Sequence, residues 1–152
     1  MSKTLIEYMK HHHIEGEYLS FKASCHSVAE AAEASGAPMS HFVKNICYIN
    51  TQNHHLIVAI VKGEHRASSK RIAKRLDIPL PRIATEEEML LLTGFPCGGI
   101  PSFGYTATFI VDDKVLELDN VYTGGGSENA LIKISVASLL EANHALVARI
   151  RK

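Results

Sequence analysis

Two apolar runs, Val43-Lys-Asn-Ile-Cys-Tyr-Ile49 and Leu56-Ile-Val-Ala-Ile-Val61, decide the fold of this chain. Both runs are rich in isoleucine and valine, and a polar segment, residues 50–55, separates them. This arrangement is typical of two strands that form a β-hairpin. The second run is apolar at every position, which predicts a strand covered on both faces of its sheet.

The rest of the chain mixes helices and strands without a regular alternation. Hydrophobic periodicity and serine or threonine caps predict helices over residues 4–13, 28–35, 69–76, 86–92 and 136–141. Short apolar runs predict further strands over residues 18–22, 107–111, 115–118, 131–134 and 145–150. We therefore expect a single α+β domain over residues 1–152, with a mixed, partly barrel-like β-sheet and flanking helices.

The charge balance and hydropathy exclude several classes of protein. The chain has 16 basic and 16 acidic residues, so a surface that coats nucleic acid by bulk charge is excluded, although a local basic patch is not. The longest apolar run, residues 56–61, is too short to cross a membrane, so no membrane partner is expected. The first ten residues lack the apolar centre of a secretory signal.

The cysteines and histidines give no support to a metal or disulfide framework. Cys25, Cys47 and Cys97 are odd in number and widely spaced, which predicts free thiols in a reducing cytoplasm. The run 11–13 is all histidine, which fits the end of a helix better than a metal-binding tract. Histidines 26, 41, 54, 55, 65 and 144 show no ligand spacing, and we expect them to be non-catalytic. No metal and no cofactor is predicted.

Common catalytic motifs are absent from the sequence. It contains no dinucleotide-binding or P-loop glycine motif, no HExxH and no GxSxG. Two glycine clusters remain, in residues 97–104 and 122–127. Adjacent glycines let backbone N–H groups approach a ligand closely, so the clusters could form an anion or oxyanion site. The alternative is a pair of surface turns.

Basic residues stand out at two places. Lys44 lies in an otherwise mostly apolar strand, where it must extend to solvent, pair with a carboxylate or meet an anionic ligand. The predicted helix 69–76 carries a compact basic face, with Lys62 and Arg66 just before it. This face, which consists of Lys70, Arg71, Lys74 and Arg75, is either a phosphate-binding patch or simply a solvated helix surface.

Several short motifs, in this order, make residues 18–149 resemble the YbaK / prolyl-tRNA synthetase-associated editing domain family. They begin with Val43-Lys-Asn45 and the basic helix, and continue with Ala84-Thr-Glu-Glu87 and with Thr93-Gly94 before Gly98-Gly-Ile100. They end with Phe109–Asp112 and with Tyr122–Gly126 ahead of a final Ile-Lys-Ile strand. The resemblance implies hydrolysis of the ester bond in mischarged aminoacyl-tRNA.

The resemblance also implies roles for individual residues. Lys44 would hold a phosphate or ribose of the terminal adenosine, and Asn45 would hydrogen-bond the substrate. The backbone amides of Gly98, Gly99 and Ile100 would form the oxyanion site. Pro101, Gly124, Gly125, Gly126 and Ser127 would line the same pocket. The family proline of the first glycine loop is expected at position 102, where this chain has Ser102, one residue after its own proline.

From the resemblance we expect a cytoplasmic, freestanding deacylase for a small amino acid such as alanine or cysteine. Aminoacyl-tRNA is its expected partner, and an aminoacyl-tRNA synthetase is a second partner that the resemblance allows. An activated ester needs a positioned water and oxyanion donors but no side-chain nucleophile, so we assign no general base. The alternative is a non-catalytic module of the same fold that binds tRNA or a synthetase.

Overall fold

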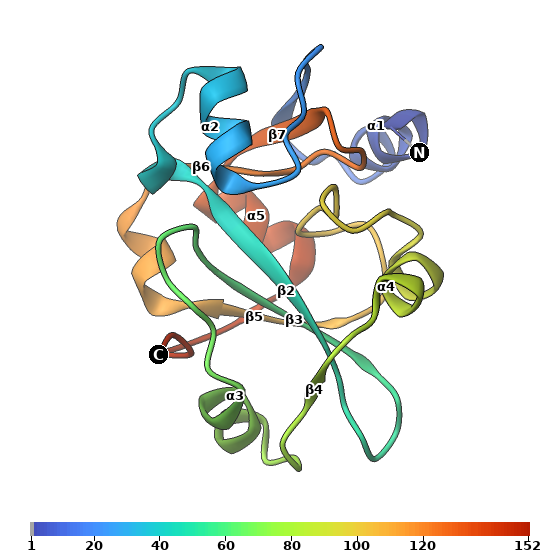
Figure 1. The fold of residues 1–152 in the computed structure, drawn as a ribbon, viewed down its shortest axis with the longest axis vertical. Coiled ribbons are helices and arrows are strands. Elements are labelled where there is room, and N and C mark those ends of the chain that lie inside the picture. Colours follow the sequence, from blue (N-terminus) through green and yellow to red (C-terminus); the bar gives the residue numbers. More distant parts are fainter. Residues whose placement is uncertain (1) are drawn as a thin grey trace.

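The structure, a computed structural model, describes residues 2–152 (Figure 1). The helices are α1 (Ser2–His11), α2 (Val28–Ser35), α3 (Ser69–Leu76), α4 (Glu86–Thr93) and α5 (Val136–Asn143), with short 3-10 helices η1 (Met39–His41) and η2 (Asp113–Glu117). The strands are β1 (Gly16–Ser20), β2 (Val43–Ile49), β3 (Leu56–Lys62), β4 (Arg82–Ile83), β5 (Thr108–Asp112), β6 (Asn120–Gly124), β7 (Ala130–Ser135) and β8 (Leu146–Ala148).

The strands form two sheets. The larger sheet has the order β4-β2-β3-β5-β8 and is mixed, because β2 pairs antiparallel with β3 and β4 while β5 runs parallel to β3 and β8. The smaller sheet has the order β1-β7-β6 and is antiparallel. The predicted α+β fold with a mixed sheet is confirmed. The two sheets form no closed barrel, and one isolated bridge, between Phe42 and Tyr122, joins them.

The β2–β3 hairpin is the centre of the molecule, as predicted. Every residue from Leu56 to Val61 is buried. Alternate side chains of β3 enter two different apolar clusters, because successive side chains in a strand point to opposite faces. Leu56 and Val58 belong to the larger cluster, and Ile57 and Ala59 belong to the smaller one. The uniform apolar pattern therefore reflects coverage on both faces.

Two predictions around the second glycine cluster are wrong. Residues 115–117 belong to η2 and Leu118 caps it, so no strand forms there, since the Asp112 side chain accepts from the Lys114 N–H and starts a helical turn. Strand β6, which was not predicted, alternates buried Val121 and Thr123 with more exposed neighbours ahead of the glycines, and the two-residue strand β4 was not predicted either. The other predicted helices and strands are present, and where their bounds differ from the prediction they do so by one or two residues.

The histidine run and the hydropathy agree with the helices observed. His11 ends α1, so the structural interpretation of that run is confirmed. Within residues 2–152, no helix has the length and apolar character that a membrane crossing needs.

Candidate active site

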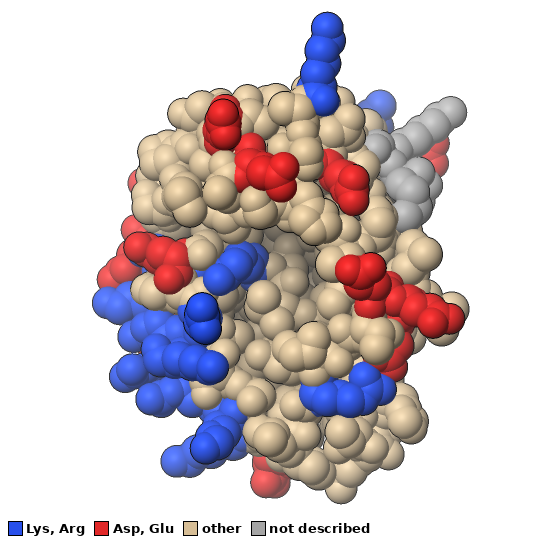
Figure 2. Space-filling model, viewed as in Figure 1, with Lys and Arg blue, Asp and Glu red and all other residues tan. Residues whose placement is uncertain are grey.

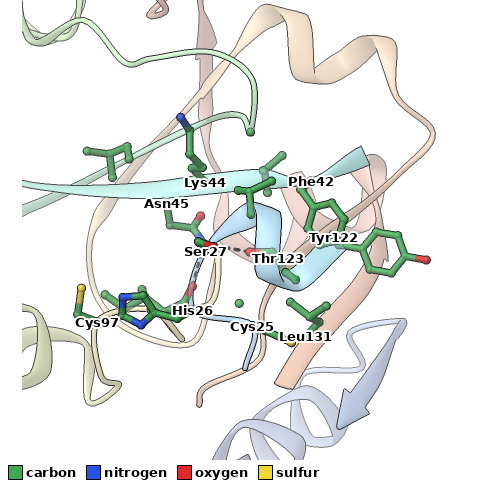
Figure 3. A pocket seen from close by; sticks show the side chains of 18 of the residues that line it. Cys25, His26, Ser27, Phe42, Lys44, Asn45, Cys97, Tyr122, Thr123 and Leu131 are labelled. Atoms are coloured by element: carbon green, nitrogen blue, oxygen red, sulfur yellow. Dashed lines mark hydrogen bonds between the residues drawn. The ribbon is translucent and has the colours of Figure 1, made fainter. Parts of the chain in front are cut away.

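A cavity of about 590 Å³ lies where the two sheets meet (Figure 3). Its walls come from β2, the N-terminal end of α2, the loop at residues 97–100 and the end of β6. The space-filling view shows it as a hollow near the middle of one face (Figure 2). Segments that are far apart in the sequence therefore converge on one site.

Lys44 lies at the rim of this cavity. It lines the large cavity and a smaller neighbouring one, and its ammonium group points away from the Asn45 amide, on the opposite face of β2 (Figure 3). Burial and the nearby Arg66 lower the pKa of Lys44 from its ordinary value. No carboxylate within residues 2–152 forms an ion pair with it. Of the alternatives that the sequence left open, an anionic ligand or solvent remains for this group.

Asn45 points to the inner side of β2, where protein groups engage its amide. Its Nδ2 donates to the Ile100 carbonyl and to Thr123 Oγ1, both at 2.9 Å. Its Oδ1 accepts a 2.7 Å hydrogen bond from Ser102 Oγ, which also lies 2.7 Å from Thr123 Oγ1. Both N–H groups of the Asn45 amide are thus engaged within the protein, where they hold the first glycine loop, and its expected contact with substrate stays a prediction.

Ser102 has a structural role at the position where the family proline is expected. Its side chain is fully buried, and the Asn143 side chain donates to its carbonyl at 3.0 Å. We predict that Ser102→Ala lowers the free energy of unfolding by about 1–3 kcal/mol, since Asn45 Oδ1 loses its donor in a buried site. Urea denaturation measures this loss. Thr106→Ala, at an exposed loop position nearby, is the control and should change stability little.

The two glycine loops pack backbone against backbone. Gly126 N–H donates to the Gly99 carbonyl at 2.7 Å and so joins the two loops, whereas Gly125 N–H donates to the Ala130 carbonyl at 3.1 Å within the turn between β6 and β7. A Cβ at Gly99 would lie 2.7 Å from the Ser127 backbone. The glycines therefore allow close approach, as expected, but what approaches is the other loop.

Only part of the predicted oxyanion site is open to a ligand. Gly99 N–H donates to the Pro96 carbonyl at 3.0 Å, so this amide is engaged. The N–H groups of Gly98 and Ile100, which both line the cavity, have no partner in the described part of the chain. Two of the three expected amide donors are thus not engaged by other protein groups, and their role as an oxyanion site stays a prediction.

The structure divides the predicted site residues into two groups. The cavity brings together Lys44, Asn45, Gly98, Ile100 and Gly124. The other residues predicted for the pocket do not line it: Gly99, Pro101, Gly125, Gly126 and Ser127. They belong to the two glycine loops. Pro101 is buried, and its carbonyl accepts a 2.6 Å hydrogen bond from the Tyr105 hydroxyl.

The basic helix face also lies outside the cavity. Lys70, Arg71, Lys74 and Arg75 are on α3, and none of them lines the cavity or forms an ion pair in residues 2–152. Figure 2 shows basic side chains gathered on one side of the hollow, over the part of the molecule where Figure 1 labels α3. The face is therefore positioned beside the site.

Known proteins share this fold and sequence pattern. The family model described as the aminoacyl-tRNA editing domain matches residues 22–142. The chain belongs to this family. The resemblance drawn from the sequence motifs is thereby confirmed.

Relatives of this editing domain are parts of larger enzymes. A proline–tRNA ligase of Trichlorobacter lovleyi is 30% identical over 103 residues, which are 67% of this chain and 18% of the ligase. A proline–tRNA ligase of Thermotoga maritima is 27% identical over 68% of this chain and 18% of its own length. The editing domain thus spans about a fifth of these relatives.

Solved structures resemble the editing domain over nearly its whole length. A hypothetical protein matches with a TM-score of 0.89 and 29% identity, over 98% of this chain and 99% of that chain. A candidate trans-editing enzyme for prolyl tRNA synthetase matches with a TM-score of 0.89 and 26% identity, over 99% of this chain and 96% of that chain.

Sequence reasoning missed several residues that line the editing domain's cavity. Cys25, Cys47 and Cys97 all line it and are free thiols, and burial raises the pKa of Cys47 to about 12. His26, predicted to be non-catalytic, lies at the mouth, with Nδ1 3.6 Å from a Glu128 carboxylate oxygen. Position 26 stands in the loop just before a capped helix, and loops often carry functional side chains.

His26 and Gly98 fit together closely. A Cβ at position 98 would lie 2.2 Å from His26 Nδ1, and Gly98 has a φ of +90°. This glycine is therefore needed both for its backbone conformation and for the space that the imidazole occupies. Among residues 2–152, no three histidine, cysteine or acidic side chains are grouped to hold a metal ion.

Proposed function

We propose that this editing domain is an aminoacyl-tRNA deacylase that acts in trans and releases a small mischarged amino acid, such as alanine or cysteine. One observation carries the proposal: Lys44 and the unpartnered amides of Gly98 and Ile100 border the same cavity. The likeness to the candidate trans-editing enzyme supports action in trans. Aminoacyl-tRNA is the proposed partner, and a location in the cytoplasm stays a prediction.

The proposed reaction needs no protein nucleophile. Water adds to the ester carbonyl carbon, and the carbonyl oxygen takes negative charge in the tetrahedral intermediate. The amides of Gly98 and Ile100 donate to that oxygen, which is the kind of interaction whose loss costs about 10²–10³ in rate. The ester bond to the ribose then breaks, the ribose oxygen takes a proton, and the free amino acid leaves.

Lys44 anchors the nucleotide end of the substrate in this proposal. Its ammonium group is partly desolvated and lacks a carboxylate, so a phosphate or ribose oxygen is a favourable partner. From the rim, the lysine can hold the adenosine end while the acyl group enters the cavity. Asn45 acts through the loop, as a positioning residue.

The walls of the cavity favour a small side chain on the substrate. Val28, Ala31, Phe42 and Leu131 give an apolar lining. A hydrophobic pocket discriminates substrates by size, and one added methylene changes the rate by only about 10–200-fold. A second enzyme that selects by size after the synthetase therefore removes mischarged products that the synthetase alone cannot exclude. The proline–tRNA ligase relatives suggest the proline tRNA as the first one to test.

A deacylation panel tests the proposed function. We expect the purified protein to release amino acid from alanyl- or cysteinyl-tRNA(Pro) about 10–100-fold faster than from prolyl-tRNA(Pro), which is the matched control. Radiolabelled amino acid release measures each rate. Binding of the tRNAs without any release above the spontaneous rate would contradict the proposal and support the alternative, a tRNA- or synthetase-binding module.

A further inference from the structure

A second, smaller cavity of about 360 Å³ adjoins the first. The two cavities share Lys44, Ile46 and Ile83 in their linings. The smaller one is also lined by Arg66, Lys152 and Ser69, the first residue of α3. Three cationic side chains thus border a hollow that opens beside the proposed ester site.

No acidic side chain balances these cations. The lining of the smaller cavity contains no aspartate or glutamate, and none of Lys44, Arg66 and Lys152 forms an ion pair with a carboxylate in residues 2–152. Arg66 contributes to the lowered pKa of Lys44, which shows that the two charges interact unfavourably. An anion between them would remove that repulsion.

Backbone pairing fixes the main chain that carries two of the cations, Arg66 and Lys152, whose side chains are exposed. Lys152 N–H donates to the Arg66 carbonyl at 2.8 Å, and Ser68 N–H donates to the Ile150 carbonyl at 2.6 Å. An isolated bridge joins Ala67 and Arg151. Because the last residues of the described chain are fixed to the segment before α3, residues 66 and 152 are held side by side. The N-terminal end of α3 adds its positive dipole at Ser69.

We propose that this smaller cavity binds the phosphodiester on the 5′ side of the terminal adenosine, with Arg66 and Lys152 completing a subsite that Lys44 begins. The inference rests on the proposed function, since it takes aminoacyl-adenosine to occupy the larger cavity. The RNA strand then continues towards the basic face of α3, on the side of the hollow where Figure 2 shows basic side chains gathered.

Binding of uncharged ligands tests this subsite without any hydrolysis. We compare adenosine with the dinucleotide CpA by calorimetry, and the readout is the ratio of their Kd values. For the wild type we expect CpA to bind about tenfold more tightly, as a charge-assisted phosphate contact allows. Arg66→Ala should reduce the ratio to about 1–2, and Arg66→Lys should keep most of it, since the charge remains.

The control is Lys10→Ala, which removes one exposed positive charge from α1, and it should leave the ratio at the wild-type value. Lys152→Ala should lower the ratio like Arg66→Ala. The dependence of CpA affinity on salt should also weaken in Arg66→Ala, by a slope of about 0.7 per lost phosphate contact.

Three results would overturn the inference. They are an equal Kd for adenosine and CpA in the wild type, a ratio that survives Arg66→Ala, and inorganic phosphate alone binding as tightly as CpA. The last result would show an anion site unrelated to the adenosine. A failed deacylation panel with an intact CpA ratio would instead contradict the proposed hydrolysis and leave the subsite as an RNA-binding site.

Discussion

Lys44→Met lowers kcat/KM for deacylation roughly 100-fold, if the lysine holds the substrate as proposed, because loss of one partner of a desolvated charged contact costs about 2–5 kcal/mol. The same substitution keeps the fold or stabilises it. Burial and Arg66 lower the pKa of Lys44, so its positive charge is less favourable in the folded protein than in the unfolded chain. Methionine retains the aliphatic packing without that cost.

Two measurements separate catalysis from folding in this variant. Initial rates on the mischarged tRNA give the loss of activity, and urea denaturation gives the free energy of unfolding. Lys114→Ala is the matched control, because this exposed lysine on η2 pairs with Glu117 at 3.1 Å and does not line the cavity. A Lys44→Met protein that is folded and deacylates at the wild-type rate would exclude the proposed role.

Asp112→Ala has the largest expected effect on stability, a loss of about 3–5 kcal/mol, since it breaks a buried ion pair. The Asp112 side chain is fully buried. Its oxygens accept from the N–H groups of Ile150 and Arg151, at 2.9 and 3.1 Å, and from the Arg151 guanidinium. One carboxylate thus connects the end of β5 to the segment that carries Lys152.

The pH dependence gives an independent check on Asp112. Burial raises the pKa of this carboxyl, but hydrogen bonds from Ile150, Arg151 and Lys114 outweigh burial and leave the pKa below its ordinary value. A lowered pKa stabilises the fold above the unfolded pKa of about 3.9, and that contribution disappears as the pH falls through the folded value.

We therefore expect the stability difference between the wild type and Asp112→Asn to be full at pH 7 and to shrink below about pH 4. Urea denaturation across this range measures it. The control is Asp113→Asn, which removes an exposed partner of the same arginine and should cost about 0–1 kcal/mol. A difference that stays constant down to pH 2 would show that the charge of Asp112 does not stabilise the fold.

The sequence predicts the fold best where a local pattern and tertiary packing agree. The β2–β3 hairpin appears at the expected residues, and so do the starts of α2 and α4, where the serine or threonine caps are Ser27 and Thr85. Strand β6, which was not predicted, has a weak local signal, because it runs into the three glycines 124–126 that indicate a turn, while pairing with β7 makes it a strand. Long-range pairing of this kind is not visible in periodicity.

The candidate site was predictable in location but less so in detail. The position of Lys44 beside Gly98 and Ile100 follows from the family motifs. The hydrogen bond between Asn45 and Ser102 could not be predicted in this way, because it joins residues 57 positions apart in the sequence. His26 was missed for the same reason, because only the folded chain places it against Gly98.

The close packing of Gly99 on the Ser127 backbone has a consequence for how selectivity can change. The two glycine loops cannot move apart to admit a larger acyl group without breaking the hydrogen bond from Gly126 N–H to the Gly99 carbonyl. A new preference for the amino acid on the substrate must then come from substitution of single residues in the cavity wall. Ala31 and Leu131 are two such residues, and they lie on α2 and β7, outside the two glycine loops. Substrate preference in proteins of this fold should therefore change by substitution of cavity side chains, while the backbone of the two glycine loops stays as it is.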